Sequence, residues 1–337
     1  MQELQEKKNQ SVGMLTQTYR PSPDALLNPL ADPTFKTLFT DASTEAHNAL
    51  TCFLTDIIGK EVSDVELQPN ELSGEAVTDK QSEFDINCKI DGKVVNIEVQ
   101  GMNNDDHYGK RVEYHVAHIY NHYVFKGMNW LEAPQAFQIS VLNFVFDEEE
   151  KDCISHYMLR NQNGRAIAGM QNVIFMELPK IENIADDISL LTANQMWGKF
   201  FLYASNSEKQ AFVNQLAEHN RGIQMAVTVL QNISQDEMNW YHETRYWMSV
   251  SDKKSMISTA EDKGMKKGLE QGIKQGIQQG LQQGIQQGLQ QGIEQKSIEA
   301  AMVLIQEFKM SPELAAQKMN APLEKLLELQ KKSQQKQ

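Results

Sequence analysis

A pair of carboxylates is the first feature of this sequence that suggests chemistry. Asp85 and Glu98 lie within EFDINCKIDGKVVNIEVQ, residues 83–100, which otherwise consists of two apolar runs. The dipeptide Asp91-Gly92 between the runs predicts a two-residue hairpin turn, because both residues tolerate a positive φ. In that register the numbers of paired residues sum to 183, so Asp85 faces Glu98. Directly opposed residues have Cβ atoms about 4.5–5.5 Å apart.

Two carboxylates at this distance repel each other, and a divalent cation would offset the repulsion. Mg²⁺ binds one or two carboxylates and keeps several waters. Side chains alternate between the faces of a strand, so the polar face is expected to hold Asp85, Asn87, Lys89, Asn96, Glu98 and Gln100, with Glu83 opposite Gln100. The apolar face is expected to hold Phe84, Ile86, Cys88, Ile90, Val95, Ile97 and Val99. One face of a hairpin is often solvated, so spacing alone leaves a metal site and a solvated face both open.

The flanking sequence indicates a mixed α/β core. Apolar residues at helical spacing predict a helix over 43–58, which Ser43 or Thr44 can cap and Gly59 ends. A second helix is predicted over 108–125. Strands are predicted over 136–146 and, more weakly, over 154–160 and 172–178, and the pattern is helical from 186 to about 250.

The predicted helix over 108–125 carries a polar strip. Arg111, His115, His118 and His122 recur at helical spacing and fall on one face. Such a strip can contact phosphates beside the sheet, or it can be a solvated helix face. No carboxylate is set among these histidines, so a histidine metal site is not expected.

Composition places the chain among ordinary globular proteins. Its 337 residues are 40% hydrophobic and 23% charged, enough for two or three domains. Cys52, Cys88 and Cys153 are few and scattered, which fits a cytoplasmic location and neither a disulfide framework nor a zinc site. The polar N-terminus has no signal-peptide core, and no run of 18 apolar residues exists, so no membrane partner is expected.

The net charge of −13 is unevenly distributed. Residues 253–337 contain 13 Lys and Arg against 9 Asp and Glu, a net of +4, so the rest of the chain carries −17. An acidic body argues against a simple nucleic-acid coat protein. It does not exclude an enzyme that cuts DNA with a metal and a local basic patch.

Glycine recurs at every fourth residue from 264 to 292, in the unit Gly-(Leu/Ile/Met)-x-(Gln/Lys). Four residues advance a helix by roughly 400°, so the stripe drifts by about 40° per repeat and favours right-handed winding of one helix about another. Each glycine costs an isolated helix about 1 kcal/mol relative to alanine. The segment is therefore expected either to pack closely in a homo-oligomer or to be a flexible tether.

Several of these stretches together resemble the PD-(D/E)XK nuclease family transposases, also called recombination-promoting nucleases. The matching stretches are DPTFKTLF at 32–39, DK at 79–80, FDINCKIDGKVVNIEVQ at 84–100, KRVEYH at 110–115, KGMNWLEAPQAFQISVLNFVF at 126–146 and ELPKI at 177–181, with the glycine repeat continuing the match. The resemblance implies a restriction-endonuclease-like mixed sheet flanked by helices. An all-α region with a glycine-repeat helix and a small helical tail is expected to follow.

With the resemblance, five regions are expected. These are a flexible N-terminal tail over 1–24, a nuclease core over 25–185, a helical extension over 186–252, a repeat helix or tether over 253–296, and a small helix-turn-helix-like tail over 297–337. The last region has no conspicuous DNA-reading face, so packing and DNA reading both remain open for it.

The resemblance also implies roles for particular residues. Asp85 falls on the family's metal-binding aspartate, and Glu98-Val99-Gln100 falls on its Glu-x-Gln motif, with the Val99 carbonyl as a further metal ligand. The wider superfamily has Lys in place of Gln100, and an amide cannot act as a base. Candidate phosphate contacts are Lys36, Lys80, Arg111 and Tyr114, and Glu45 is the candidate for the superfamily's extra acidic residue.

The implied function is a DNA endonuclease that uses Mg²⁺, with Mn²⁺ as a substitute, in recombination, element mobility or phage defence. The alternative is a weak or inactive DNA-binding or regulatory oligomer that retains the nuclease fold. Intact Asp85, Glu98 and Gln100 favour the enzyme. The missing Lys, the acidic body and the long tail favour the alternative.

Overall fold

The computed structural model describes residues 20–72, 82–101 and 107–334. The chain divides into two compact units, Met1–Asp252 and Lys253–Gln337. In the part of the chain that the structure describes, no helix combines the length and the apolar character needed to span a membrane.

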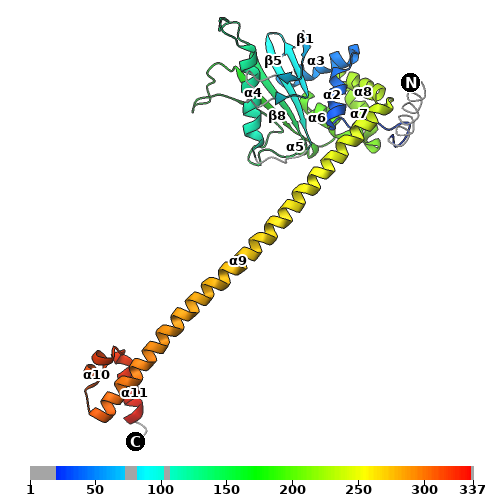
Figure 1. Ribbon diagram of the computed structural model, residues 1–337. Coiled ribbons are helices and arrows are strands. Elements are labelled where there is room, and N and C mark those ends of the chain that lie inside the picture. The colour runs from blue at the N-terminus through cyan, green and yellow to red at the C-terminus, as the bar shows by residue number, and fades with distance from the viewer. Residues whose placement is uncertain (1–19, 73–81, 102–106, 335–337) are drawn as a thin grey trace, which may run out of the picture. The chain divides into compact units, whose positions relative to one another are not determined.

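A six-stranded mixed sheet forms the centre of the first unit (Figure 1). In spatial order its strands are β1 (Val65–Gln68), β4 (Ile86–Ile90), β5 (Lys93–Gln100), β6 (Gln135–Leu142), β8 (Gln171–Glu177) and β7 (Ile154–Met158). Strands β1, β4 and β5 pair antiparallel, β5, β6 and β8 pair parallel, and β7 pairs antiparallel with β8. The expected mixed sheet with flanking helices is confirmed.

The β4–β5 hairpin has the predicted register. Ile90 pairs with Lys93 and Ile86 with Ile97, and Asp91 and Gly92 at the turn have φ angles of 43° and 75°. The ladder stops at Ile86, however, so Asp85 lies in a bend just before β4 and not in a ladder pair with Glu98. The expected pairing of Glu83 with Gln100 is wrong, because Glu83 pairs with Glu71 in a separate sheet of β2 (Glu71–Leu72) and β3 (Ser82–Glu83).

Several helices cover one face of the sheet (Figure 1). Apolar side chains fill the space between these helices and the sheet. The helices on this face include α2 (Asp32–Thr40), α3 (Thr44–Ile58), α6 (Ala193–Tyr203), α7 (Gln210–His219) and α8 (Arg221–Ile233), and the short α5 (Leu178–Glu182) also contributes to the core. Helix α3 forms where predicted, because the Ser43 side chain caps Ala46 N–H and Gly59 ends the helix at φ 71°. The segment 186–252 shares this core with the sheet.

The other face of the sheet packs against α4 (Tyr108–Tyr123) (Figure 1). Phe84 belongs to this side, where it shares a cluster with Val94, and not to the apolar face on which alternation placed it. Asn87, Asn96 and Glu98 are 0%, 0% and 3% exposed. The solvated polar face that the hairpin spacing left open is therefore excluded for these residues.

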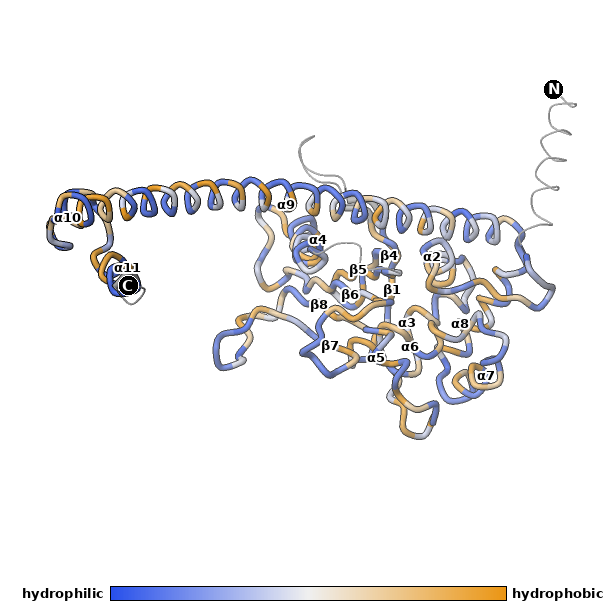
Figure 2. The backbone as a smooth tube through the Cα atoms, turned by 90° about the horizontal axis from the view of Figure 1, so that it is seen from below, coloured by the Kyte–Doolittle hydropathy of each residue, from blue (hydrophilic) through white to orange (hydrophobic). Residues whose placement is uncertain are grey.

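The second unit begins within α9 (Glu237–Phe308), which contains the whole glycine repeat. It ends with α10 (Pro312–Met319) and α11 (Leu323–Gln334), which form a small core with the last turns of α9. Apolar residues recur along the repeat (Figure 2), and they are exposed: Ile277 is 67% and Leu281 63% accessible. The repeat is thus helical, with an apolar stripe that its own unit does not cover.

Candidate active site

Asp85 is held at the end of the hairpin opposite the turn. Its Oδ2 atom accepts a hydrogen bond from the Val99 N–H at 2.8 Å. The Lys36 ammonium of α2 lies 3.5 Å from its Oδ1 atom, and the Asp85 side chain is only 15% exposed. The bend before β4 thus brings this carboxylate to the last residues of β5 and to the first turns of α2.

A second aspartate, Asp32, joins this group from the first turn of α2. Asp32 and Lys36 are separated by four residues on one helix, and the Lys36 ammonium lies 3.3 Å from the Asp32 Oδ1 atom. The Asp32 and Asp85 carboxyl groups are close enough to interact directly. Lys36 therefore contacts both aspartates. The sequence signal for Asp32 was weak, because an acidic residue in the first turn of a helix is common without any function.

The electrostatics of Asp85 reflect this crowding. Burial, the neighbouring Asp32 carboxyl and the charge of Glu98 raise the pKa of Asp85 well above its ordinary value, while the hydrogen bond from Val99 N–H opposes the rise. Nearby negative charges and desolvation both raise the pKa of a carboxyl group. The three acidic side chains therefore form one electrostatic cluster that favours binding of a cation.

Glu98 lies on β5 beneath α4 and is almost fully buried. Its Oε1 atom is 3.0 Å from Nδ1 of His115 and 3.3 Å from Nδ2 of Asn96. Its Oε2 atom is buried and has no hydrogen-bond partner among the described residues. The expectation that no carboxylate accompanies the histidines of α4 is wrong, because tertiary packing brings Glu98 from the sheet to His115.

The other predicted residues are distributed around this group. Gln100 ends β5 and is half-buried, and Val99 is 4% exposed. The Arg111 guanidinium lies 4.8 Å from the centre of the Tyr108 ring. Tyr114 is 38% exposed.

The structure does not support a place in the site for two further candidates, for different reasons. Lys80 lies outside the described residues. Glu45 is exposed in the first turn of α3 and is not among the groups that act on Asp85. Asp32, which sequence reasoning missed, occupies the place beside Asp85 that was expected for Glu45.

The residues present fit a hard divalent cation. Within the described part of the chain, the Glu98 Oε2 atom is buried and has no hydrogen-bond partner. The Asp32 Oδ1 atom is also buried and has no hydrogen-bond partner there, although the Lys36 ammonium lies 3.3 Å away. Such oxygens are available to a cation. Among the same residues, no three or more His, Cys, Asp or Glu side chains are placed so that together they could hold a metal ion. Mg²⁺ does not need three such side chains, because it binds through one or two carboxylates and retains waters.

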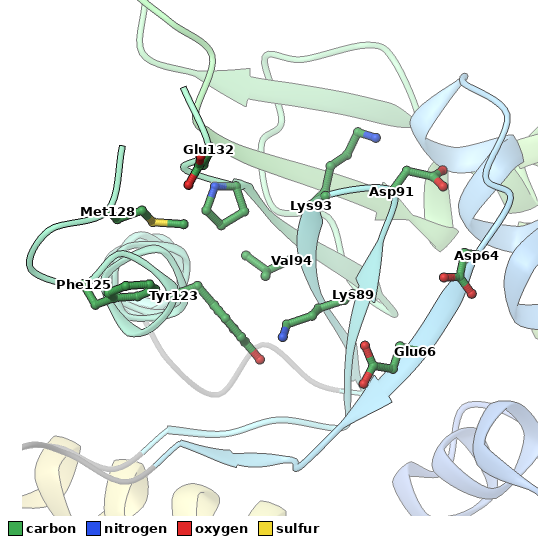
Figure 3. Close-up of a pocket in the computed structure, with 12 residues that line it drawn as sticks. Asp64, Glu66, Lys89, Asp91, Lys93, Val94, Tyr123, Phe125, Met128 and Glu132 are labelled. Carbon is green, nitrogen blue, oxygen red and sulfur yellow. The ribbon is translucent and has the colours of Figure 1, made fainter. Parts of the chain in front are cut away.

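An open pocket of about 450 Å³ lies elsewhere, at the turn end of the hairpin (Figure 3). Its walls carry both charges, and the Lys89 ammonium lies 5.0 Å from the centre of the Tyr123 ring. Asp85, Glu98 and Gln100 do not line it. The cluster of carboxyl groups is therefore a separate site.

The fold agrees with a family model that matches the chain. The model for the PD-(D/E)XK nuclease family transposases covers residues 29–260, so the chain belongs to this family. The match stops before the glycine repeat, which the resemblance by motifs had included. No curated protein and no solved structure matches the chain. At the level of the family, the chain is a nuclease-type hydrolase with a role related to transposases.

Proposed function

We propose that the chain is a DNA endonuclease that hydrolyses phosphodiester bonds with Mg²⁺, for which Mn²⁺ can substitute. One observation carries the proposal. Asp32, Asp85 and Glu98 converge from a helix, a bend and a strand into one cluster of carboxyl groups, in which the Asp85 and Glu98 side chains are only 15% and 4% exposed. A fold gains no stability from bringing like charges together, so a cation that the cluster binds explains the arrangement.

Asp85, Glu98 and the Val99 carbonyl would hold the ion, with Asp32 as an additional carboxylate. A bound Mg²⁺ lowers the pKa of a coordinated water and stabilises the negative charge that develops on the phosphate. His115 and Asn96 hold the Glu98 carboxylate in place from α4 and β5. Partners of this kind fix the orientation of metal ligands and are important for affinity.

Lys36 and Gln100 would act on the substrate. The Lys36 ammonium lies 3.3 Å from the Asp32 carboxylate and 3.5 Å from the Asp85 carboxylate. It would therefore supply, from α2, the positive charge that a Lys at the position of Gln100 supplies in the wider superfamily. An amide can donate a hydrogen bond to a phosphate oxygen or orient a water, although it cannot take a proton. We assign Arg111 and Tyr114 to contacts with the DNA backbone further along α4. Lys80 remains a candidate for the same role.

The first test is plasmid cleavage by purified wild-type protein and Asp85→Ala, with Mg²⁺, with Mn²⁺ and with EDTA. We expect metal-dependent nicking or linearisation that falls by at least about 1,000-fold in the variant, since removal of a single transition-state-stabilising group already costs about 100- to 1,000-fold. Asp64→Ala is the matched control, because Asp64 is exposed near the turn end of the same hairpin. Equal activity in wild type and Asp85→Ala would remove Asp85 from the site.

We propose that this activity serves recombination, element mobility or phage defence. The family description supports a link to transposition. Cleavage of DNA inside cells, measured as induction of a DNA-damage response by wild type and not by Asp85→Ala, would support the role in living cells.

A second proposal concerns assembly, and the exposed stripe on α9 favours it. Ile273, Ile277, Leu281 and Ile285 are all more than half exposed, and an added Cβ at any repeat glycine meets nothing within 4 Å. Gly-apolar stripes of this kind permit close approach of two helices. We propose a homo-oligomer through the C-terminal helices. If cleavage is absent under every metal condition, a DNA-binding or regulatory oligomer becomes the better description.

A further inference from the structure

The first turns of α9 are built into the first unit. Trp240 is 6% exposed, and its indole Nε1 donates a hydrogen bond to the Ser234 carbonyl at 2.9 Å. Glu243, one turn later, is 8% exposed. This end of α9 is therefore part of the same core as the sheet, although the catalytic motifs of the family lie in other elements.

Glu243 anchors the segment that carries Asp32. Its Oε2 atom accepts hydrogen bonds from Asn28 N–H and Thr34 Oγ1, each at 2.8 Å. Its Oε1 atom accepts a longer one from the Trp247 indole at 3.4 Å. Asn28 and Thr34 lie on either side of Asp32 in the chain. A single buried carboxylate of α9 thus fixes the chain before and after this aspartate.

Tyr246 lies on the next turn and reaches the site itself. Burial and the charges of Asp32 and Asp85 raise the pKa of Tyr246, and a hydrogen bond with the backbone of Asp32 opposes the rise. A Cβ added to Gly101 would lie 3.3 Å from the Tyr246 hydroxyl oxygen. The hydroxyl therefore lies between the start of α2 and the residue that directly follows Gln100.

The contact supports the start of α2. Asp32 is the first residue of α2, and the first N–H groups of a helix have no partner within the helix. The Tyr246 hydroxyl oxygen accepts a hydrogen bond from the backbone of Asp32 and so provides a partner outside the helix. The phenolic O–H can also act as a donor.

We propose that Tyr246 is a positioning residue of the metal site, which holds Asp32 next to Asp85 through the Asp32 backbone. This inference rests on the proposed function, since it assigns a role in the same site. It makes the helix that carries the glycine repeat a structural part of the nuclease centre. A truncated chain that ends before α9 would lose both Tyr246 and Glu243.

The test is Mn²⁺ binding to the full-length protein by calorimetry, for wild type, Tyr246→Phe, Asp85→Ala and Tyr241→Phe. Loss of one hydrogen bond is expected to weaken Mn²⁺ binding about threefold to tenfold in Tyr246→Phe, while cooperative urea unfolding shows that the variant is folded. Asp85→Ala should show no measurable binding. Tyr241→Phe is the matched control, because its ring packs against His242 on the same helix. It should bind as wild type does.

Gly101→Ala provides an independent variant. Its methyl group would lie 3.3 Å from the Tyr246 hydroxyl oxygen, a tight contact that requires the hydroxyl to move by a few tenths of an ångström. We expect Gly101→Ala to weaken Mn²⁺ binding in wild type and to have no further effect in Tyr246→Phe, where the hydroxyl is absent.

The outcomes separate the two proposals. If Asp85→Ala binds Mn²⁺ as tightly as wild type does, the metal site itself is wrong. If Asp85→Ala loses binding while Tyr246→Phe retains full affinity, only the role of Tyr246 is overturned. The role of Tyr246 is also overturned if Gly101→Ala weakens Mn²⁺ binding equally in wild type and in Tyr246→Phe. It is likewise overturned if Tyr241→Phe loses as much Mn²⁺ affinity as Tyr246→Phe does.

Discussion

Two regions of the molecule are incomplete in opposite ways. At the open end of the β4–β5 hairpin, acidic side chains are buried together, and the Glu98 Oε2 atom has no hydrogen-bond partner within the described ranges. Along the glycine repeat of α9, apolar side chains such as Ile277 and Leu281 are exposed. The cation that we propose would neutralise the first region, and the partner helix that we propose would cover the second. Buried charge and exposed apolar surface both cost free energy, so each feature supports one of these two proposals.

The largest expected effect concerns the exposed stripe. Ile277→Glu together with Ile285→Glu should convert the proposed oligomer into monomer, because each carboxylate would be buried in an apolar contact between helices. Gln279→Glu with Gln287→Glu is the matched control, since it adds the same charge at repeat positions that carry neither the glycine nor the apolar residue. Light scattering of the eluting protein measures the mass. A wild-type monomer would contradict the proposed assembly.

At the site, the next effect concerns His115. His115→Ala removes one of the two side chains that hold the Glu98 carboxylate and should lower Mn²⁺ affinity and the cleavage rate about 10- to 100-fold. His122→Ala changes an exposed histidine on the same helix and should leave both quantities at their wild-type values. Equal losses in the two variants would show that α4 acts only through its general stability.

The charge cluster itself predicts a pH dependence of stability. Burial and neighbouring carboxyl groups raise the pKa of Asp85 in the folded state. The stability that Asp85 contributes is therefore fully present below the pKa of an unfolded Asp, about 3.9. It is lost as the pH rises through the higher pKa of Asp85 in the folded protein. In EDTA at neutral pH, Asp85→Asn should raise the free energy of unfolding, because the amide removes the negative charge that Asp32 and Glu98 repel.

This gain should shrink as the pH falls toward 4, because wild-type Asp85 then takes up its proton. Urea unfolding of both proteins at several pH values measures it. A constant difference between them across this range would contradict the assignment to Asp85.

The smallest effect concerns a single glycine of the repeat. Gly280→Ala should stabilise an isolated α9 helix by about 1 kcal/mol, but its methyl group should obstruct close helix packing in the proposed oligomer. We therefore expect higher helix content in dilute protein and weaker self-association. Circular dichroism and sedimentation measure the two quantities. If both rise together, the glycines are not contact points.

The hairpin shows how far local sequence could go. The Asp91-Gly92 turn and the register were predictable, because turn chemistry depends on two residues and the register follows from the turn. The same reasoning placed Glu83 opposite Gln100, which is wrong. Alternation assumes a continuous strand, and the chain bends at Asp85 and pairs Glu83 with Glu71.

The sequence by itself determined the apolar strands, the capped helix α3, the four-residue period of the repeat and the candidates Asp85 and Glu98. These features depend on residue types and on spacings within one element. Only the tertiary structure brought Asp32, His115 and Tyr246 to the carboxylates, from three helices far apart in the chain. The packing of helices on the sheet decides which of many polar side chains meet, and no local pattern records that choice.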